Sequence, residues 1–211
     1  MDAPAPPGPM LPGTYREQLW TALLRARVCA YPLPPHGHHP NFVGARQAAR
    51  QLLAHPQVAG LHTLIVGPDR VLAPLRKLAL EAGVTLYVPH QKKVGQRGQV
   101  WYWRLTDPAG ARLSAMPGVG EPALFVPGGP SLPGAQAAVI ASVALGRGGA
   151  RLGKGFGWAA RGLGLGLGLG PGLPEYTLAH PLMLSPTLPC PADSRVALIG
   201  TPDGVLDPTT L

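Results

Sequence analysis

The segment GRGGARLGKGFGWAAR, residues 146–161, combines residue types that suit the binding of a phosphate group. Three of its glycines, Gly153, Gly155 and Gly157, alternate with larger residues, and alternate glycines let backbone N–H groups turn toward a bound anion. The segment has no acidic residue. Its four cations are Arg147, Arg151, Lys154 and Arg161. The spacing is neither that of a P-loop nor that of a dinucleotide-binding fingerprint. It predicts a triphosphate-binding loop, with a solvated basic turn as the alternative.

The apolar run directly before this segment, AAVIASVAL at residues 137–145, predicts the strand that would position the loop. Earlier in the chain, the strand LHTLIVG at 61–67 and the strand VTLYVP at 84–89 flank the helix RVLAPLRKLALEAG at 70–83. Gly83 is a residue type that commonly follows the end of a helix. This unit predicts two parallel strands joined by a right-handed crossover. Because open sheets bind ligands beyond the carboxyl ends of their strands, the basic loop is expected to open onto a cleft there.

Other patterns complete the expected sheet and its helices. The segment TYREQLWTALLRAR, 14–27, predicts a helix in which Thr14 caps the N-terminus and Glu17 completes a capping box. Helical spacing returns at 45–54. The remaining strands are predicted at 99–105 and 195–200. Together these elements predict an α/β fold, a three-layer domain with a mostly parallel sheet.

The composition is that of a folded domain with an anionic partner. The chain has 211 residues, of which 45% are hydrophobic and 13% are charged, so it can bury a core. The net charge of +8 favours a nucleotide or another polyanion. Residues 1–13 are proline-rich and predict a mobile tail before a single domain at 14–211. The repeat GLGLGLGLG at 162–170 predicts no regular element, because alternate glycines disfavour both helix and strand.

Two classes of protein are excluded by these patterns. No run of 18 or more consecutive apolar residues exists, so no transmembrane helix is expected. The first residues lack a cationic start and an apolar segment, so no signal peptide is expected. Cys29 and Cys190 form neither a disulfide framework nor a zinc motif, and they suit buried thiols in a reducing compartment. We therefore expect a cytoplasmic protein.

The sequence RLGKGFGWAA, residues 151–160, resembles the signature R-L-G-x-G-x-G-Y-Y-D of the 5-formyltetrahydrofolate cyclo-ligases. It is more similar still to the cyclo-ligase-like proteins called methenyltetrahydrofolate synthetase domain-containing proteins, whose pattern reads R-I-G-K-G-E-G-Y-A-D. Three further segments resemble these proteins in the same order: REQLW at 16–20, PNFVGARQAARQLL at 40–53 and TPDGVL at 201–206. The resemblance extends over about residues 14–207.

This resemblance implies a fold of the type shared with ribose-5-phosphate isomerases and CoA transferases. It also implies a reaction in which ATP phosphorylates the formyl oxygen of 5-formyltetrahydrofolate. N10 then attacks the activated carbon, and phosphate leaves to give 5,10-methenyltetrahydrofolate and ADP. Arg151 and Lys154 are implied as the catalytic side chains, which face the phosphates, and Asn41 and Phe42 would help to form the folate side of the cleft. The residues implied for ATP binding are Arg151, Gly153, Lys154, Gly155, Phe156, Gly157 and Trp158.

The chain departs from the family pattern at the residues that would hold Mg²⁺. The last Asp of the signature corresponds to Ala160, and a later Asp corresponds to Ala197. Asp193, at an earlier Asp position, is the remaining candidate ligand. Mg²⁺ takes oxygen ligands, often one or two carboxylates besides phosphate and water. We therefore expect ATP binding with a weakened Mg²⁺ site and slow or absent turnover.

The alternative function is a non-catalytic module that binds RNA or another polyanion on the same fold. Two weaker signals also have two interpretations. A solvated polar loop is the favoured interpretation of His36, His38 and His39, and a metal site is the other. Trp101 and Trp103 share a face of their predicted strand, where packing against a helix is favoured over stacking on a pterin. In either case we expect a monomer.

Overall fold

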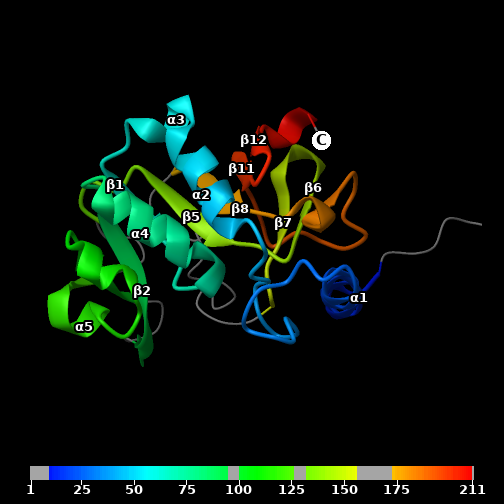
Figure 1. Ribbon diagram of the computed structural model, residues 1–211, viewed down its shortest axis with the longest axis horizontal. Helices are drawn as coiled ribbons and strands as arrows, with labels where there is room; N and C mark the ends of the chain where they lie inside the picture. The colour runs from blue at the N-terminus through cyan, green and yellow to red at the C-terminus, as the bar shows by residue number, and fades with distance from the viewer. Residues whose placement is uncertain (1–9, 95–99, 126–131, 156–172, 211) are drawn as a thin grey trace, which may run out of the picture.

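The computed structural model describes residues 10–94, 100–125, 132–155 and 173–210. Within these residues the main element is an eight-stranded sheet in the order β12-β11-β8-β5-β1-β2-β3-β4 (Figure 1). Its strands are β1 (Thr63–Val66), β2 (Thr85–Val94), β3 (Val100–Leu105), β4 (Glu121–Phe125), β5 (Ala137–Ala141), β8 (Glu175–Leu178), β11 (Leu198–Thr201) and β12 (Gly204–Leu206).

The five middle strands of this sheet run parallel. β1 pairs in parallel with β2 and β5, and β8 pairs in parallel with β5 and β11. The helix α4 (Ala73–Glu81) connects β1 to β2, which is the predicted crossover unit. Antiparallel pairs add β3 and β4 at one edge and β12 at the other. The predicted α/β class with a mostly parallel sheet is confirmed.

Two helices, α2 (Ala45–Ala54) and α4, lie side by side on one face of the sheet (Figure 1). The small apolar residues Ala48 and Ala49 of α2 are fully buried, as their helical spacing predicts. α4 ends as predicted, because Gly83 follows it with a φ of +80°. The other α-helices are α1 (Pro12–Arg25), α3 (Pro56–Ala59) and α5 (Met116–Val119), and the 3-10 helices are η1 (Arg70–Leu72), η2 (Pro108–Ala111), η3 (Arg147–Gly149), η6 (Pro181–Met183) and η7 (Pro208–Thr210).

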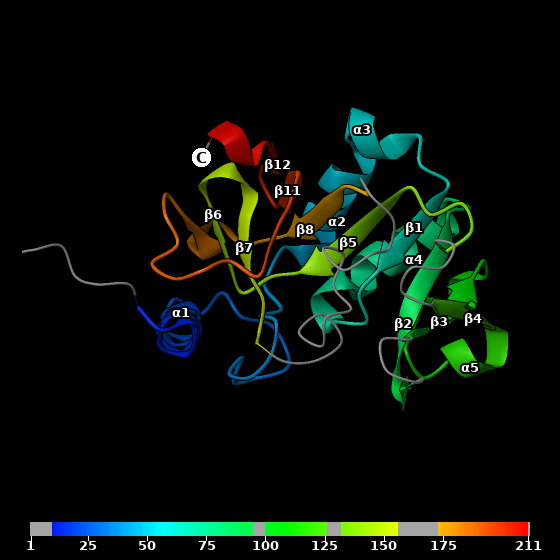
Figure 2. The ribbon, with the colours of Figure 1, turned by 180° about the vertical axis from the view of Figure 1, so that it is seen from behind.

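A smaller sheet, in the order β10-β7-β6-β9, lies at the end of the molecule away from β3 and β4 (Figures 1 and 2). It divides two strands that the sequence predicts as continuous. The run 137–145 separates into β5 and β6, and the run 195–200 separates at Val196 and Ala197. The prediction of single strands was wrong because residues 137–145 are buried throughout, so their pattern carries no sign of a change of sheet. The strands of this sheet are β6 (Ala144–Gly146), β7 (Ala150–Leu152), β9 (Leu184–Ser185) and β10 (Ser194–Arg195).

The first helix begins before the residue that the sequence pattern favours. α1 starts at Pro12 and has no side-chain cap, so the predicted cap at Thr14 was wrong. Proline suits the first helical position because its fixed φ is helical and its missing N–H would have no partner there. The Met10 N–H donates to the Pro189 carbonyl at 2.8 Å, so the last residues of the predicted tail belong to the fold. Within the described residues, no helix is long and apolar enough to cross a membrane.

The attachment of the small sheet gives a stability prediction at Gly149. This residue has a φ of +78°, and its carbonyl accepts from the Val196 N–H at 2.9 Å. A Cβ at Gly149 would collide with the Val196 carbonyl, whereas a Cβ at Gly83, with nearly the same φ, would meet nothing within 4 Å. Gly83→Ala should lower the free energy of unfolding by about 1–2 kcal/mol through backbone strain alone. Gly149→Ala should lower it by roughly 1–3 kcal/mol more through overpacking. Equal losses in urea denaturation would show that the small sheet is not held at this contact.

Candidate functional site

The basic glycine-containing loop follows β7 and lies at the carboxyl ends of the parallel strands. β7 runs antiparallel to β6 and returns the chain to the end of β5, where the Val143 N–H donates to the Leu152 carbonyl at 2.7 Å. Gly153 and Lys154 follow directly. The turn after β1, Gly67–Asp69, leaves the sheet at the same edge. The predicted position of the loop is therefore confirmed for residues 153–155 at the end of β5, whereas the cleft expected there stays a prediction.

Arg151 lies beneath this loop and is only 3% exposed. Its Nε donates to the Ala141 carbonyl at the end of β5 at 3.0 Å, and one terminal nitrogen donates to the same oxygen. Burial lowers the pKa of Arg151, while the carboxylates of Glu175 and Asp193 act in the opposite direction. Because a guanidinium remains protonated in proteins, Arg151 places a fixed positive charge under the loop.

Two side chains from distant parts of the sequence anchor the loop. The Gly153 N–H donates to Asp193 Oδ2 at 2.7 Å, and Arg16 Nε donates to the Gly153 carbonyl at 2.6 Å. Arg16 Nη2 also lies 3.5 Å from Asp193 Oδ2. Arg16 was not predicted as a site residue, although it begins the REQLW segment that resembles the family. That segment was the signal that could have identified it.

The close packing of two arginines accounts for the glycines at 153 and 155. A Cβ on Gly153 would lie 3.0 Å from Arg151 Nη2, and a Cβ on Gly155 would lie 2.9 Å from Arg16 Nη1. Gly155 also has a φ of +87°, which side chains disfavour. Since the Gly153 N–H already bonds Asp193, this part of the predicted anion cradle is engaged within the protein. Phe156, Gly157 and Trp158 lie outside the described residues, as do Ala160 and the repeat at 162–170.

His39 connects the loop to the turn after β1. Its Nδ1 lies 2.7 Å from Asp69 Oδ1, and its Nε2 accepts from the Lys154 N–H at 3.3 Å. Because Nε2 is an acceptor, the proton of the neutral ring sits on Nδ1 and is donated to Asp69. Lys154 Nζ lies 3.8 Å from the same carboxylate oxygen. The structure therefore brings together a buried imidazole, a carboxylate and the lysine that the sequence analysis proposed for phosphate binding.

The charges of this cluster follow from its burial. Burial lowers the pKa of His39, against the opposing effect of Asp69, so the imidazole is held neutral. Burial alone would raise the pKa of Asp69, but the hydrogen bond from His39 and the cations of Lys154 and Arg151 hold it well below its usual range. The cluster thus contains a neutral base, an ionised carboxylate and a lysine at its edge.

The three neighbouring histidines have separate environments. The interpretation as a solvated loop was wrong for His39, which is 8% exposed. The His36 ring lies 5.8 Å from the Trp20 ring, and Trp20 Nε1 donates to the His38 carbonyl at 3.0 Å. These contacts attach the 31–40 loop to α1. Among the residues that the structure describes, no three His, Cys, Asp or Glu side chains gather into a metal site.

The two residues expected on the folate side support their own segment. Asn41 Nδ2 donates to the Tyr31 carbonyl at 2.9 Å, and Asn41 Oδ1 accepts from the Phe42 N–H. Phe42 is 2% exposed, and its ring meets the ring of His180 edge-on at 6.0 Å. Their backbone continues from His39, so their position relative to the loop is fixed through that residue. A direct contact of either side chain with folate stays a prediction.

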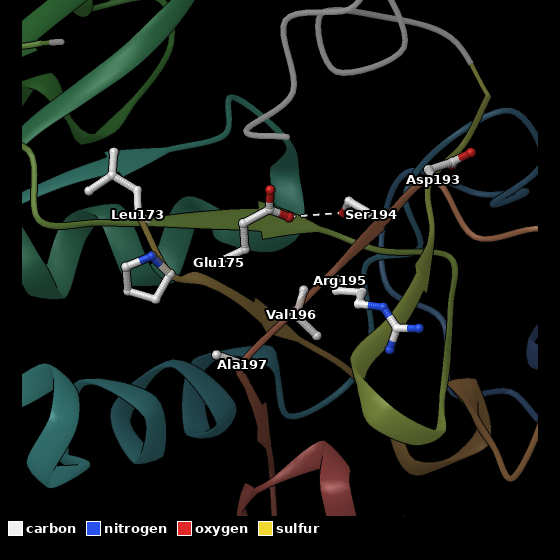
Figure 3. Close-up of a pocket in the computed structure, with 8 residues that line it drawn as sticks. Leu173, Glu175, Asp193, Ser194, Arg195, Val196 and Ala197 are labelled. Carbon is white, nitrogen blue, oxygen red and sulfur yellow. Dashed lines mark hydrogen bonds between the residues drawn. The ribbon is translucent and has the colours of Figure 1, made fainter. Parts of the chain in front are cut away.

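A hollow of about 410 Å³ lies next to Asp193, between the start of β8 and residues 193–197 (Figure 3). Glu175 Oε2 accepts from Ser194 Oγ at 2.9 Å, and burial raises the pKa of Glu175. Figure 3 shows the Asp193 side chain turned away from Glu175, so the two carboxylates do not converge on one point. Ala197 lies at the other end of the hollow.

The described residues therefore do not fit a resident Mg²⁺. Asp193 Oδ2 is engaged by Gly153 and Arg16, and Ala197 has no ligand atom. Mg²⁺ requires near-octahedral oxygen coordination, which one partly engaged carboxylate does not supply without phosphates and water.

The neutral state of His39 gives a pH prediction. Because its pKa is lower in the folded than in the unfolded chain, the folded state binds fewer protons. The stability is then complete above about pH 6.5, the ordinary value for His, and falls as the pH decreases. The slope contributed by one such group reaches about 1.4 kcal/mol per pH unit.

His39→Gln should reduce this slope between pH 6.5 and 5, since Gln can donate to Asp69 and accept from Lys154 without titrating. Urea denaturation at several pH values measures it, and His62→Gln, at an exposed position, is the control. A slope unchanged in His39→Gln would contradict the neutral, buried assignment.

Comparison with known proteins identifies relatives of this chain. A protein of Mus musculus described as a methenyltetrahydrofolate synthase domain-containing protein is 33% identical over 155 residues, which are 68% of this chain and 39% of that protein. A Homo sapiens protein of the same description is 29% identical over 151 residues, 68% of this chain and 38% of that protein. The chain thus spans about two fifths of the length of the curated relatives it matches.

A solved structure shares the fold. The NMR structure of Aquifex aeolicus 5,10-methenyltetrahydrofolate synthetase matches with a TM-score of 0.59 and 19% identity, covering 91% of this chain and 92% of that one. The sequence model of the 5-formyltetrahydrofolate cyclo-ligase family matches residues 14–202, which include most of α1, the His39 loop, the turn after β1 and Asp193. The resemblance read from the sequence is confirmed, and the chain belongs to the 5-formyltetrahydrofolate cyclo-ligase family.

Proposed function

We propose that this chain binds ATP at the loop after β7 and a reduced folate beside it, and that it converts 5-formyltetrahydrofolate to 5,10-methenyltetrahydrofolate slowly or not at all. Family membership supports the ligands. The observation that carries the proposal is the position of Lys154, which His39 and Asp69 hold at the carboxyl edge of a parallel sheet. This edge is where open α/β sheets bind their ligands.

Lys154 and Arg151 have different roles in this proposal. Lys154 is 21% exposed at its side chain, and its ammonium group would neutralise phosphate charge directly. Arg151 is buried against Ala141, so it would act by placing charge beneath the phosphates and by holding the loop to β5. Arg16 adds a third cation next to Gly153. Catalysis would depend on positioning and charge neutralisation, as in other phosphoryl transfers.

The proposed reaction needs no covalent intermediate between substrate and protein. The formyl oxygen attacks the γ-phosphorus and ADP leaves. N10 then adds to the activated carbon and loses its proton to solvent, and the carbon–oxygen bond breaks to release phosphate. Cations that face the phosphates would stabilise the charge in the first step. With Ala160 and Ala197 at the two Asp positions of the family pattern, the first step would lack metal-held charge, which supports slow turnover.

A non-catalytic polyanion-binding module is the second candidate. The net charge of +8 supports it, as does the loss of the family's carboxylates. The two candidates differ in their dependence on nucleotide and folate, which the experiments below separate. A cytoplasmic location and a monomeric state stay predictions.

Lys154→Met should weaken ATP binding at least fivefold in calorimetry, which corresponds to about 1 kcal/mol for a charge-assisted hydrogen bond. Arg25→Gln, which removes an exposed cation at the end of α1, is the matched control and should leave the affinity unchanged. Equal affinity of wild type and Lys154→Met would remove Lys154 from the site. Absence of ATP binding by the wild type would remove the site itself.

Formation of the methenyl product, followed by its absorbance, tests catalysis. With ATP and 5-formyltetrahydrofolate, the wild type should form product slowly or not at all, with little response to Mg²⁺. Ala160→Asp should increase the dependence of ATP binding on Mg²⁺, because it restores a hard oxygen ligand. Rapid Mg²⁺-dependent turnover by the wild type would contradict the weakened state and would make Asp193 the first residue to test as a metal ligand.

A further inference from the structure

A basic pocket lies beside α4, and its residue Arg76 contacts the Gly67–Asp69 turn. It has a volume of about 760 Å³, which falls within the range of small-molecule sites. Five cationic side chains line it and no acidic one does. They are Arg46, Arg70, Arg76, Lys77 and Arg112.

Arg76 forms a fixed part of this pocket. It is 1% exposed, its Nη1 donates to the carbonyls of Gly67 and Asp69 at 2.7 and 3.0 Å, and its Nε donates to the Ala111 carbonyl at 3.3 Å. Burial lowers the pKa of Arg76 to about 10, so it is charged at neutral pH. Neutral carbonyls orient the guanidinium but do not cancel its charge. The pocket therefore keeps a positive charge in a low-dielectric surrounding.

The other cations keep most of their charge available. The described residues give Arg46, Arg70 and Arg112 no acidic partner, and the ion pair of Lys77 with Glu81 joins two exposed side chains, where water screens it. Arg70 lies over the ring of Tyr31 at 4.5 Å, an arrangement that restricts its side chain before any ligand arrives. The carboxylate of Asp69 offsets part of the charge of Arg76, but it bonds His39 and does not line the pocket.

We propose that this pocket binds a small ligand carrying two or more phosphate groups, at a site separate from the loop after β7. Four of its five cations are arginines, whose planar guanidinium groups match phosphate oxygens in pairs. One monovalent anion would leave most of the charge of the pocket uncompensated, whereas adjacent phosphates match it. The proposal does not depend on the proposed function, because none of its side chains belongs to the Lys154 cluster.

Calorimetry with inorganic pyrophosphate at constant ionic strength tests the site. Arg46→Gln/Arg112→Gln removes two exposed cations whose side chains form no hydrogen bond or ion pair with the described residues, and it should weaken binding at least about tenfold. The control Arg25→Gln/Arg27→Gln removes the same charge from exposed positions at the end of α1 and should leave binding unchanged. Equal weakening in both double variants would show a response to net charge alone and would overturn the proposal.

Lys154→Met separates the two sites. If it leaves pyrophosphate binding intact while the pocket variant loses it, the pocket is the binding site. If Lys154→Met alone removes binding, the anion occupies the loop, and the pocket proposal is overturned while the proposed function is supported. Two equivalents of pyrophosphate bound to the wild type, with one lost in each variant, would support both. Binding of a single-stranded RNA oligonucleotide but not of pyrophosphate would overturn the small-ligand proposal.

Discussion

The turn that follows β1, Gly67 to Asp69, is the constraint on which both charged regions of the molecule depend. Its carbonyls at Gly67 and Asp69 accept from Arg76, while the Asp69 carboxylate faces His39 on the other side. A buried carboxylate is tolerated only when charge and hydrogen bonds compensate it. His39 also accepts from the Lys154 N–H. A change at this turn would therefore alter both the loop after β7 and the position of Arg76 in the basic pocket.

Buried arginines at strand ends recur in this structure for a common reason. Backbone carbonyls where a strand ends can lack a partner on the neighbouring strand, and a buried carbonyl needs a donor. Arg151 meets this need at Ala141 after β5, and Arg76 meets it at Gly67 after β1. In both cases a guanidinium replaces water as the donor, which leaves fixed positive charge at the carboxyl edge of the sheet. That fixed charge is the physical basis on which both proposed anion sites rest.

Sequence patterns predicted the structure correctly where a single helix or strand has a single hydrophobic periodicity. The crossover unit around α4, the span of α2 at 45–54 and the glycine after α4 were predicted on that basis. The patterns failed where long-range contacts decide. The division of 137–145 between two sheets follows from pairing with distant strands, and burial throughout conceals it.

The features of the candidate site also separate into local ones, which the sequence predicts, and long-range ones, which it does not. Its loop could be predicted because glycine spacing and cations are local features, and the collinear motifs identified the family. The burial of His39 could not be predicted, because its partners Asp69 and Lys154 are remote in sequence. Arg16 was missed for the same reason, since its contact with Gly153 joins α1 to β7.

The use of its carboxylates supports the proposal that this site depends little on a metal ion. The chain has only ten acidic residues, and two of them, Asp69 and Asp193, hold the loop in place. A metal ion that bound Asp193 would compete with Arg16 for the same oxygen, and one that bound Asp69 would compete with Lys154. Fixed cations therefore stabilise these carboxylates whether or not a ligand is present. In the proposed function, phosphates bound at this loop would be neutralised by Lys154, Arg151 and Arg16, and they would have correspondingly less to gain from Mg²⁺.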